Sequence, residues 1–204
     1  MQSQTILVTR WMPKSKVVIK EQCELSAVQP AAEMEIVIEP EVEMNALEQM
    51  LPITPVEVMA AYIGFTRAFH LWFHSAHNLA KGTGFAGDHV SLYGPIYVDV
   101  QDSIDRVIEK AIGVFDDESL GCPMRITSDA ALILDGWNSP AGQPPATIAD
   151  AALAYAEQFV LLDERVAQTL EEMGALTYGL DNLLAELADA HEGYVYLLRQ
   201  RAKN

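Results

Sequence analysis

Four histidines lie close together in the sequence, and three of them recur at helical spacing. His70, His74 and His77 are separated by four and three residues, so their side chains share one face of a helix. His89 follows just beyond the turn at Gly82-Thr83-Gly84. Fe(II) accepts imidazole nitrogen as well as oxygen ligands. The spacing therefore indicates a helix face that could bind iron.

Two carboxylates follow at a spacing that matches the histidines. Asp105 and Glu109 are four residues apart, so they point the same way on a helix. Carboxylates offset the charge that iron gains when Fe(II) is oxidised, and carboxylates and imidazoles on facing helices build the iron sites of helical bundles. Taken singly, such a histidine is more often a hydrogen-bonded structural residue, and such an acidic pair is usually a solvated face. Only the combination favours a metal site.

Four long helices are predicted to position these residues. Thr54-Pro55-Val56-Glu57 combines an N-cap Thr, a Pro at the first helical position and a Glu at the third. Apolar residues then recur at helical spacing with no Pro until about Ala80. Three further helices are expected over 88–115, from a Thr147 cap to Met173, and from Tyr178 to Arg201.

The connection between the second and third helices is too long for a simple turn. It runs from Asp116 to Ala146 and contains Ser128–Leu134, which we expect to be a short helix. A bundle with one long crossover between its second and third helices is the ferritin-like arrangement. The predicted fold is therefore all-α, a ferritin-like four-helix bundle with a short crossover helix.

The first part of the chain differs from the rest in composition. Residues 1–20 hold four basic residues and no acid, whereas residues 21–48 hold eight Glu and no Lys or Arg. Short β-rich runs such as TILVTRW and KVVIKE occur here. We expect residues 1–53 to be a small, strand-containing N-terminal extension and residues 54–204 to be the bundle domain.

Composition limits the partners. The 204 residues carry a net charge of −16, which disfavours nucleic acid and anionic membranes and favours metal ions and polycations. A solvated acidic surface would explain the charge equally well. The two cysteines suggest neither a disulfide framework nor a zinc finger, and no run of about 18 apolar residues occurs. We expect a cytoplasmic protein outside the membrane.

The motif His77-x4-Gly82-x2-Phe85-x3-His89, followed by Ile104-Asp105-x3-Glu109, resembles the signature of the Dps family, or miniferritins. The likeness extends to the last predicted helix, Tyr178-Gly-Leu-Asp181-Asn-Leu-Leu-Ala-Glu186-x4-His191-Glu192-x4-Tyr196-Leu-Leu-Arg199, and to Gly121-Cys-Pro-Met at the start of the crossover. It covers about residues 54–202.

The resemblance implies an iron-oxidising centre shared by two subunits. His77 and His89 of one chain would face Asp105 and Glu109 of its mate. Iron would be bound as Fe(II), oxidised preferentially by hydrogen peroxide, and stored as ferric mineral in a hollow twelve-subunit shell of this chain. Family members that bind DNA usually do so through lysine-rich tails, and because of the surrounding acidic charge we expect no DNA binding here.

The sequence departs from the family pattern at three places. Tyr93 stands where most members have Asp, and Asn78 stands where Trp is common. The His89–Asp105 interval is one residue longer than usual, which would rotate the carboxylates by about 100° on a regular helix. Gly94-Pro95 lies within this interval and could absorb the extra residue as a break or π-bulge.

Two other readings stay open. A ferritin-like bundle that has lost its centre would serve as a structural or interaction module. A metal centre inside one subunit would normally use Glu-x-x-His pairs, and the sequence has none. Outside the motif, His70 and His74 are expected to pack in a core or interface, or to form an extra metal site or entry relay. His191 is expected to make a structural hydrogen bond.

Overall fold

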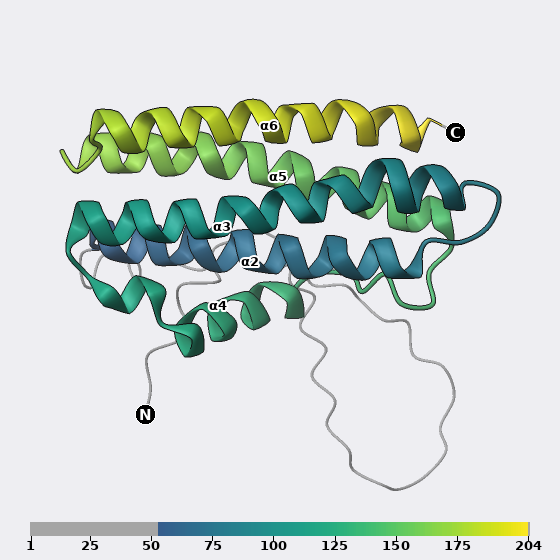
Figure 1. The fold of residues 1–204 in the computed structure, drawn as a ribbon, viewed down its shortest axis with the longest axis horizontal. Coiled ribbons are helices and arrows are strands. Elements are labelled where there is room, and N and C mark those ends of the chain that lie inside the picture. Colours follow the sequence, from purple (N-terminus) through teal and green to yellow (C-terminus); the bar gives the residue numbers. More distant parts are fainter. Residues whose placement is uncertain (1–52, 204) are drawn as a thin grey trace, which may run out of the picture. The chain divides into compact units, whose positions relative to one another are not determined.

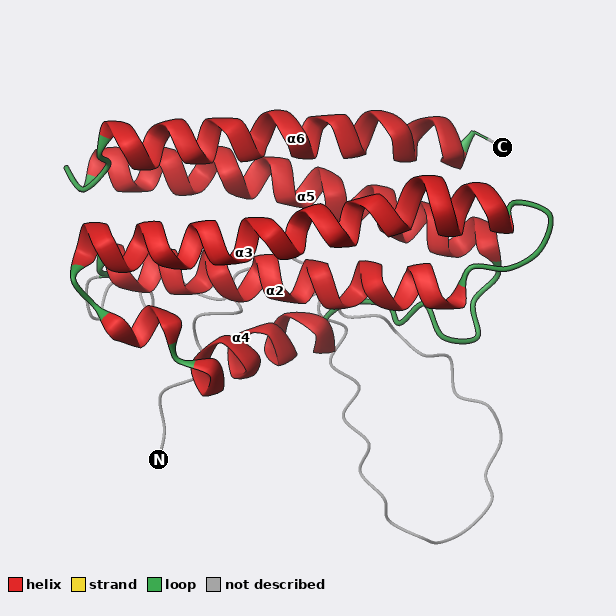
Figure 2. Cartoon of the chain, in the orientation of Figure 1, coloured by secondary structure: helices red, strands yellow, loops and turns green. Residues whose placement is uncertain are grey.

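The computed structural model describes residues 53–203, which form helices joined by short loops and contain no strand (Figure 2). The predicted strand-containing extension falls on residues that lie outside this described part, and the division near residue 53 stays a prediction. The helical elements are α2 (Pro55–Leu79), the π-helix η2 (Gly87–Tyr93), α3 (Gly94–Phe115), the 3-10 helix η3 (Glu118–Gly121), α4 (Pro123–Asp135), α5 (Pro145–Glu172) and α6 (Tyr178–Ala202).

Four long helices form the bundle. α2 packs along α3, and α5 packs along α6, while α2 also contacts α5 and α3 contacts α6. Figure 1 shows these two pairs with the short helix α4 lying across α2. The crossover from α3 to α5 therefore carries a short helix on the outer side of α2, and the predicted ferritin-like architecture is confirmed.

The start of α2 follows the predicted capping box. The Thr54 side chain accepts a hydrogen bond from the Glu57 backbone N–H at 3.2 Å, and the Glu57 carboxylate accepts one from the Thr54 backbone N–H at 2.7 Å. Pro55 occupies the first helical position, where no N–H is needed. These residues fix where the histidine-bearing helix begins.

Two helix starts in the crossover differ from the prediction. α5 begins at Pro145, with no side-chain cap, so the prediction that Thr147 caps this helix is wrong. The fixed φ of Pro145 suits a first helical position, which places Thr147 inside the first turn. For the same reason α4 begins at Pro123, earlier than the expected Ser128.

The core is rich in aromatic side chains. Phe69 packs on Phe159 with ring centroids 4.8 Å apart, and both side chains are fully buried. Trp72 is also buried, and its indole N–H donates to the Asn138 carbonyl at 2.8 Å. The Tyr155 hydroxyl accepts from the Asn138 backbone N–H at 2.7 Å. Trp72 is thus a structural residue that, with Tyr155, anchors the crossover to the bundle.

None of the helices in residues 53–203 is long and apolar enough to cross a membrane.

Candidate metal centre

His77 and His89 meet at the end of the bundle where α2 passes into η2. His77 lies in the last turn of α2 and His89 lies in the π-helix, and Gly82 adopts a positive φ of 77° in the loop between them. The two rings stack with centroids 3.7 Å apart and planes inclined by 16°. The structure therefore brings together the two histidines of the predicted motif.

Reciprocal hydrogen bonds fix both rings. His77 Nδ1 lies 2.8 Å from the His89 carbonyl oxygen, and His89 Nδ1 lies 2.8 Å from the His77 carbonyl oxygen. A carbonyl can only accept, so each Nδ1 must carry the proton. Both Nε2 atoms are then left with the lone pair that binds metal. This is how metal-binding histidines are usually oriented, with the second ring nitrogen donating to a carbonyl or carboxylate.

The distance between the two rings indicates whether they can bind one metal ion together or two ions separately. Two imidazoles that bind one tetrahedral ion at about 2.0–2.1 Å have ring centres about 5 Å apart. At 3.7 Å the rings are too close for an ordinary angle at one ion. The stacked pair therefore favours two neighbouring metal positions, one on each ring.

The π-helix accommodates the extra residue between His89 and Asp105. Its seven residues end at Tyr93, immediately before the Gly94-Pro95 pair where the sequence predicted an adjustment. A π-turn holds one more residue than an α-turn, so α3 can continue in phase. A π-helix is therefore present where the sequence allowed a break or π-bulge, and the resulting register of Asp105 and Glu109 stays a prediction.

Tyr93, the last residue of this π-helix, is buried in the core. Its side chain is 1% exposed and meets Phe73 edge-on at 6.1 Å. Burial, and next the charge of Asp88, raise the pKa of the Tyr93 phenol, which keeps it neutral. Tyr93 is therefore a core residue, and its neutral phenol does not act as a carboxylate would.

Gly94 takes the place beside the histidines. A Cβ added to Gly94 would lie 2.7 Å from the His89 carbonyl oxygen and 3.2 Å from His77 Nδ1. These two atoms are hydrogen-bonded to each other, so no side chain fits here without disturbing the pair. The requirement for glycine could not be foreseen, because it arises from the π-turn.

An ion pair anchors η2 to the last helix. The Arg201 guanidinium donates to both oxygens of Asp88, at 2.6 and 3.0 Å, and Asp88 is 3% exposed. Asp88 also raises the pKa of the Arg201 guanidinium, chiefly through these hydrogen bonds. Because Asp88 precedes His89 in the chain, the ion pair fixes the backbone that carries the second histidine. Sequence reasoning missed this ion pair, because its two residues are 113 positions apart and meet only in the fold.

The carboxylates Asp105 and Glu109 lie on exposed positions of α3. Within residues 53–203, no three His, Cys, Asp or Glu side chains are grouped closely enough to hold a metal ion. The four predicted ligands therefore form two separate pairs in one chain, the stacked imidazoles and the exposed carboxylates.

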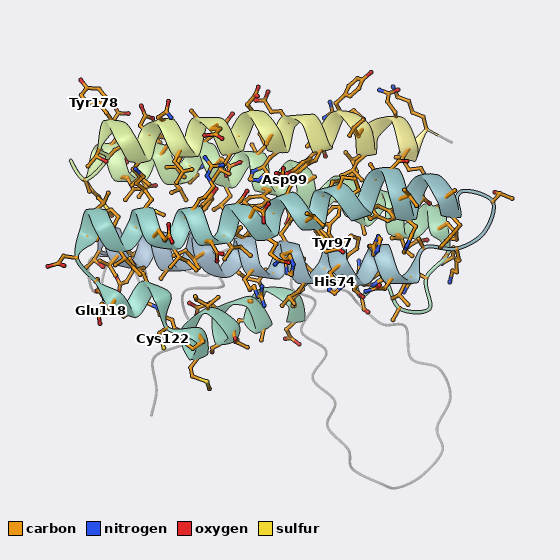
Figure 3. All side chains as sticks on the ribbon, in the orientation of Figure 1. His74, Tyr97, Asp99, Glu118, Cys122 and Tyr178 are labelled. Carbon is orange, nitrogen blue, oxygen red and sulfur yellow. The ribbon has the colours of Figure 1, made fainter. Side chains whose placement is uncertain are left out.

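Tyr97 extends the row of rings toward the middle of α2. Its ring centroid lies 5.0 Å from that of His77 and 4.7 Å from that of His74, and Figure 3 shows Tyr97 and His74 on the same side of the bundle. His70 follows one turn further on and is only 6% exposed. Burial, and then the charge of Arg67, lower the pKa of His70, so its ring is neutral near pH 7.

His191 has a different environment in the bundle core. Its Nδ1 lies 2.6 Å from one oxygen of Asp163, and the Tyr62 hydroxyl donates to the other at 2.7 Å. His191 and Asp163 are each 1% exposed, and Tyr62 is fully buried. The predicted structural hydrogen bond of His191 is confirmed, and it joins α2, α5 and α6.

The four long helices and the crossover helix define a Dps-like, ferritin-like bundle. The structure is similar to a Dps from Mycobacterium smegmatis, with a TM-score of 0.57 and 18% identity over 72% of this chain and 85% of that one. It is also similar to a mutant Dps from Listeria innocua, with a TM-score of 0.62 and 11% identity over 76% and 97% of the two chains.

A third similar structure is the Dps of Thermosynechococcus elongatus, with a TM-score of 0.57 and 18% identity over 77% of this chain and 92% of that one. No family model matches the sequence, and no curated protein does. The fold is therefore established by structural likeness, at identities too low to carry the function with it.

Proposed function

We propose that the protein is a miniferritin, which binds Fe(II) at sites shared by two copies, oxidises it with hydrogen peroxide and stores the ferric product inside a homo-oligomeric shell of twelve subunits. His77 and His89 of one copy and Asp105 and Glu109 of another would be the ligands. The observation that carries the proposal is the stacked imidazole pair, in which both Nδ1 atoms are held by carbonyls.

The imidazole pair supports Fe(II) binding before oxidation. Neutral nitrogen ligands suit Fe(II), and their orientation is fixed in advance, so little rotamer entropy is lost when the metal binds. The stacked spacing suits two irons. Two Fe(II) ions supply the two electrons that reduce one hydrogen peroxide to the level of water.

The exposed carboxylates support the second half of the reaction. Two Fe(II), one peroxide and two waters give two FeOOH units and four protons, so the products need negative ligands and an outlet for protons. Asp105 and Glu109 would act as the negative ligands, and because they lie on an exposed helix face, the protons can pass from them to solvent. The net charge of −16 would in addition draw cations toward the shell.

The oligomer is part of this proposal, because one chain does not group the four ligands. Its partners are further copies of the chain, Fe(II) and hydrogen peroxide, in the cytoplasm. DNA binding is not part of the proposal.

Anaerobic Fe(II) oxidation by added peroxide tests the proposal. The full chain, sized by light scattering, should oxidise Fe(II) well above the rate in buffer as a particle of about twelve subunits. His77→Ala and Asp105→Ala should each slow oxidation at least tenfold. Asn78→Ala and Asp102→Ala are matched controls, since both alter exposed neighbours on the same helices, and they should leave the rate unchanged.

Mixing the two inactive variants tests whether the site is shared. Mixed shells should recover part of the rate, because some interfaces then combine an intact imidazole pair with an intact carboxylate pair. A small oligomer that oxidises iron no faster than buffer would instead identify the protein as a non-catalytic, structural ferritin-like bundle.

A further inference from the structure

A second pair of histidines lies on α2, separate from the motif. His70 and His74 are one turn apart, with ring centroids 6.1 Å apart and planes inclined by 33°. Histidines at this spacing on a helix point to one side and are a known metal-binding arrangement. The pair therefore has the right residue types and spacing for a metal.

His70 is the unusual member of this pair. It is 6% exposed, yet neither ring nitrogen has a hydrogen-bond partner. Gln101 is close enough to favour the charged ring, but it does not reach hydrogen-bond geometry. A buried polar group without a partner costs about 1–3 kcal/mol. A ligand that binds the nitrogen would remove this cost.

The other buried or partly buried histidines each have a hydrogen-bond partner, which His70 lacks. His77 and His89 bind each other's carbonyl oxygens through Nδ1, and His191 binds Asp163 through the same atom. Each of these rings has at least one nitrogen engaged. Only at His70 are both nitrogens of a buried ring left over, among the residues that the structure describes.

The ring separation is close to that of two imidazoles on one ion. Ligation at about 2.0–2.1 Å with tetrahedral angles needs ring centres about 5 Å apart. His74 is exposed and can rotate to close the difference, while His70 is held by its surroundings. Tyr97 packs against both rings, at 6.1 Å from His70 and 4.7 Å from His74.

We propose that His70 and His74 form a second metal site, which binds one divalent transition-metal ion such as Co²⁺, Zn²⁺ or Cu²⁺ through two imidazole nitrogens. No third His, Cys, Asp or Glu of residues 53–203 joins them, so water completes the coordination. The positive charge of Arg67 acts on His70 and opposes a cation, so the site selects ions with high affinity for nitrogen over Mg²⁺ or Ca²⁺.

Cobalt and copper binding to the full chain test this site. The chain is first freed of metal with a chelator, and a His77→Ala/His89→Ala variant removes the motif pair. Co²⁺ titration, followed by visible absorption, should show one ion per chain in this background. Cu²⁺ should give an electron paramagnetic resonance spectrum with nitrogen coupling from two imidazoles.

Adding His74→Ala to this background should weaken binding at least tenfold and remove the two-nitrogen signature. His74 is exposed, so the variant should keep its helical circular dichroism, and Asn78→Ala in the same background should bind as before. Equal binding with and without His74, or no binding in the background variant, would overturn the proposal.

A second comparison uses the unaltered motif. In the otherwise native chain, His74→Ala should lower the bound Co²⁺ by one ion per chain, and His70→Gln should do the same. Peroxide-driven iron oxidation should be unchanged by His74→Ala. An unchanged Co²⁺ count would refute the second site, whereas absent iron oxidation with the expected loss of one ion would refute only the miniferritin proposal.

Discussion

Two regions of the bundle use histidine in opposite ways. In the core, His191, Asp163 and Tyr62 form a buried network in which each oxygen of the carboxylate accepts a hydrogen bond, while His191 Nε2 has no partner. Along α2 and η2, the imidazoles bind backbone carbonyls or nothing, and at least one nitrogen of each ring is left over. The first arrangement joins three helices through a buried carboxylate, whereas the rings of the second, among the described residues, are hydrogen-bonded to no carboxylate.

The comparison shows that burial alone does not determine the hydrogen-bond partner of a histidine. His70 and His191 are both buried and lie on long helices. Only His191 faces a carboxylate. The candidate metal ligands of this bundle are therefore rings that are oriented by carbonyls or left unpaired, whereas the carboxylate-bound His191 lies where three helices meet.

The largest loss of stability is expected when the carboxyl of Asp163 is removed. Asp163→Ala leaves two buried groups, Tyr62 and His191, without their partner, and each costs about 1–3 kcal/mol. We expect a loss of about 2–6 kcal/mol in the free energy of unfolding, measured by urea denaturation. Asp189→Ala, an exposed acid on α6, is the control. Equal stability of the two variants would contradict a structural role for the network.

A methyl group at Gly94 should damage the other region. Gly94→Ala places a Cβ against the His89 carbonyl and the His77 ring, and overpacking of this kind costs about 1–3 kcal/mol. The Nδ1 proton signals of both histidines should shift or broaden in the NMR spectrum. Gly113→Ala, a helical position with open space, should leave them unchanged. Undisturbed signals in Gly94→Ala would show that the close approach is not required.

The pH dependence of the free energy of unfolding should reveal that His70 is buried and neutral in the folded chain. The folded pKa of His70 lies below 6.5, because burial, and then Arg67 and His74, disfavour the charged ring more than Gln101 favours it. As the pH falls below about 6.5, the unfolded chain takes up a proton that the folded chain resists. The stability that His70 contributes is therefore present above this pH and lost below it.

In the His70→Gln variant the side chain at position 70 cannot take up a proton. In the presence of a chelator, the free energy of unfolding of this variant should therefore fall less steeply between pH 6.5 and 5 than that of the parent chain. Denaturant titrations at several pH values measure this slope. Parallel slopes for the two proteins would argue against a neutral, buried His70.

The smallest effect is expected at an exposed ion pair. Arg106 donates to Glu186 across α3 and α6 at 2.7 Å, and both side chains are about half exposed. Solvent screens such pairs, so Arg106→Gln should leave the urea midpoint within experimental error. A clear loss of stability would show that this pair, unlike other surface pairs, is needed to hold α3 against α6.

Local signals in the sequence were enough to predict most of the fold. The Thr54 capping box, the long apolar periodicity and the extended crossover gave the bundle and its connection. The start of α5 was missed because Thr147 has the side chain of a cap, whereas Pro145 suits the first helical position better. Two neighbouring signals for a helix start compete here, and the sequence alone does not show which of them is stronger.

The candidate site was predicted less completely. The motif spacing correctly indicated that His77 and His89 belong together, and Gly94-Pro95 pointed to the π-turn. Hydrogen bonds from side chains to backbone carbonyls, and an ion pair between Asp88 and Arg201, depend on the fold and leave no pattern in the sequence. The meeting of the imidazoles with Asp105 and Glu109 stays a prediction, because it involves two copies.

The Asp88–Arg201 ion pair has a practical consequence for anyone who modifies this protein. Arg201 lies in the last turn of α6, so the backbone next to His89 is secured by a residue at the far end of the chain. A deletion or fusion that frays this turn would leave a buried carboxylate unpaired and release the π-helix. Any loss of iron oxidation in a variant altered at the end of α6 should therefore first be checked against this contact.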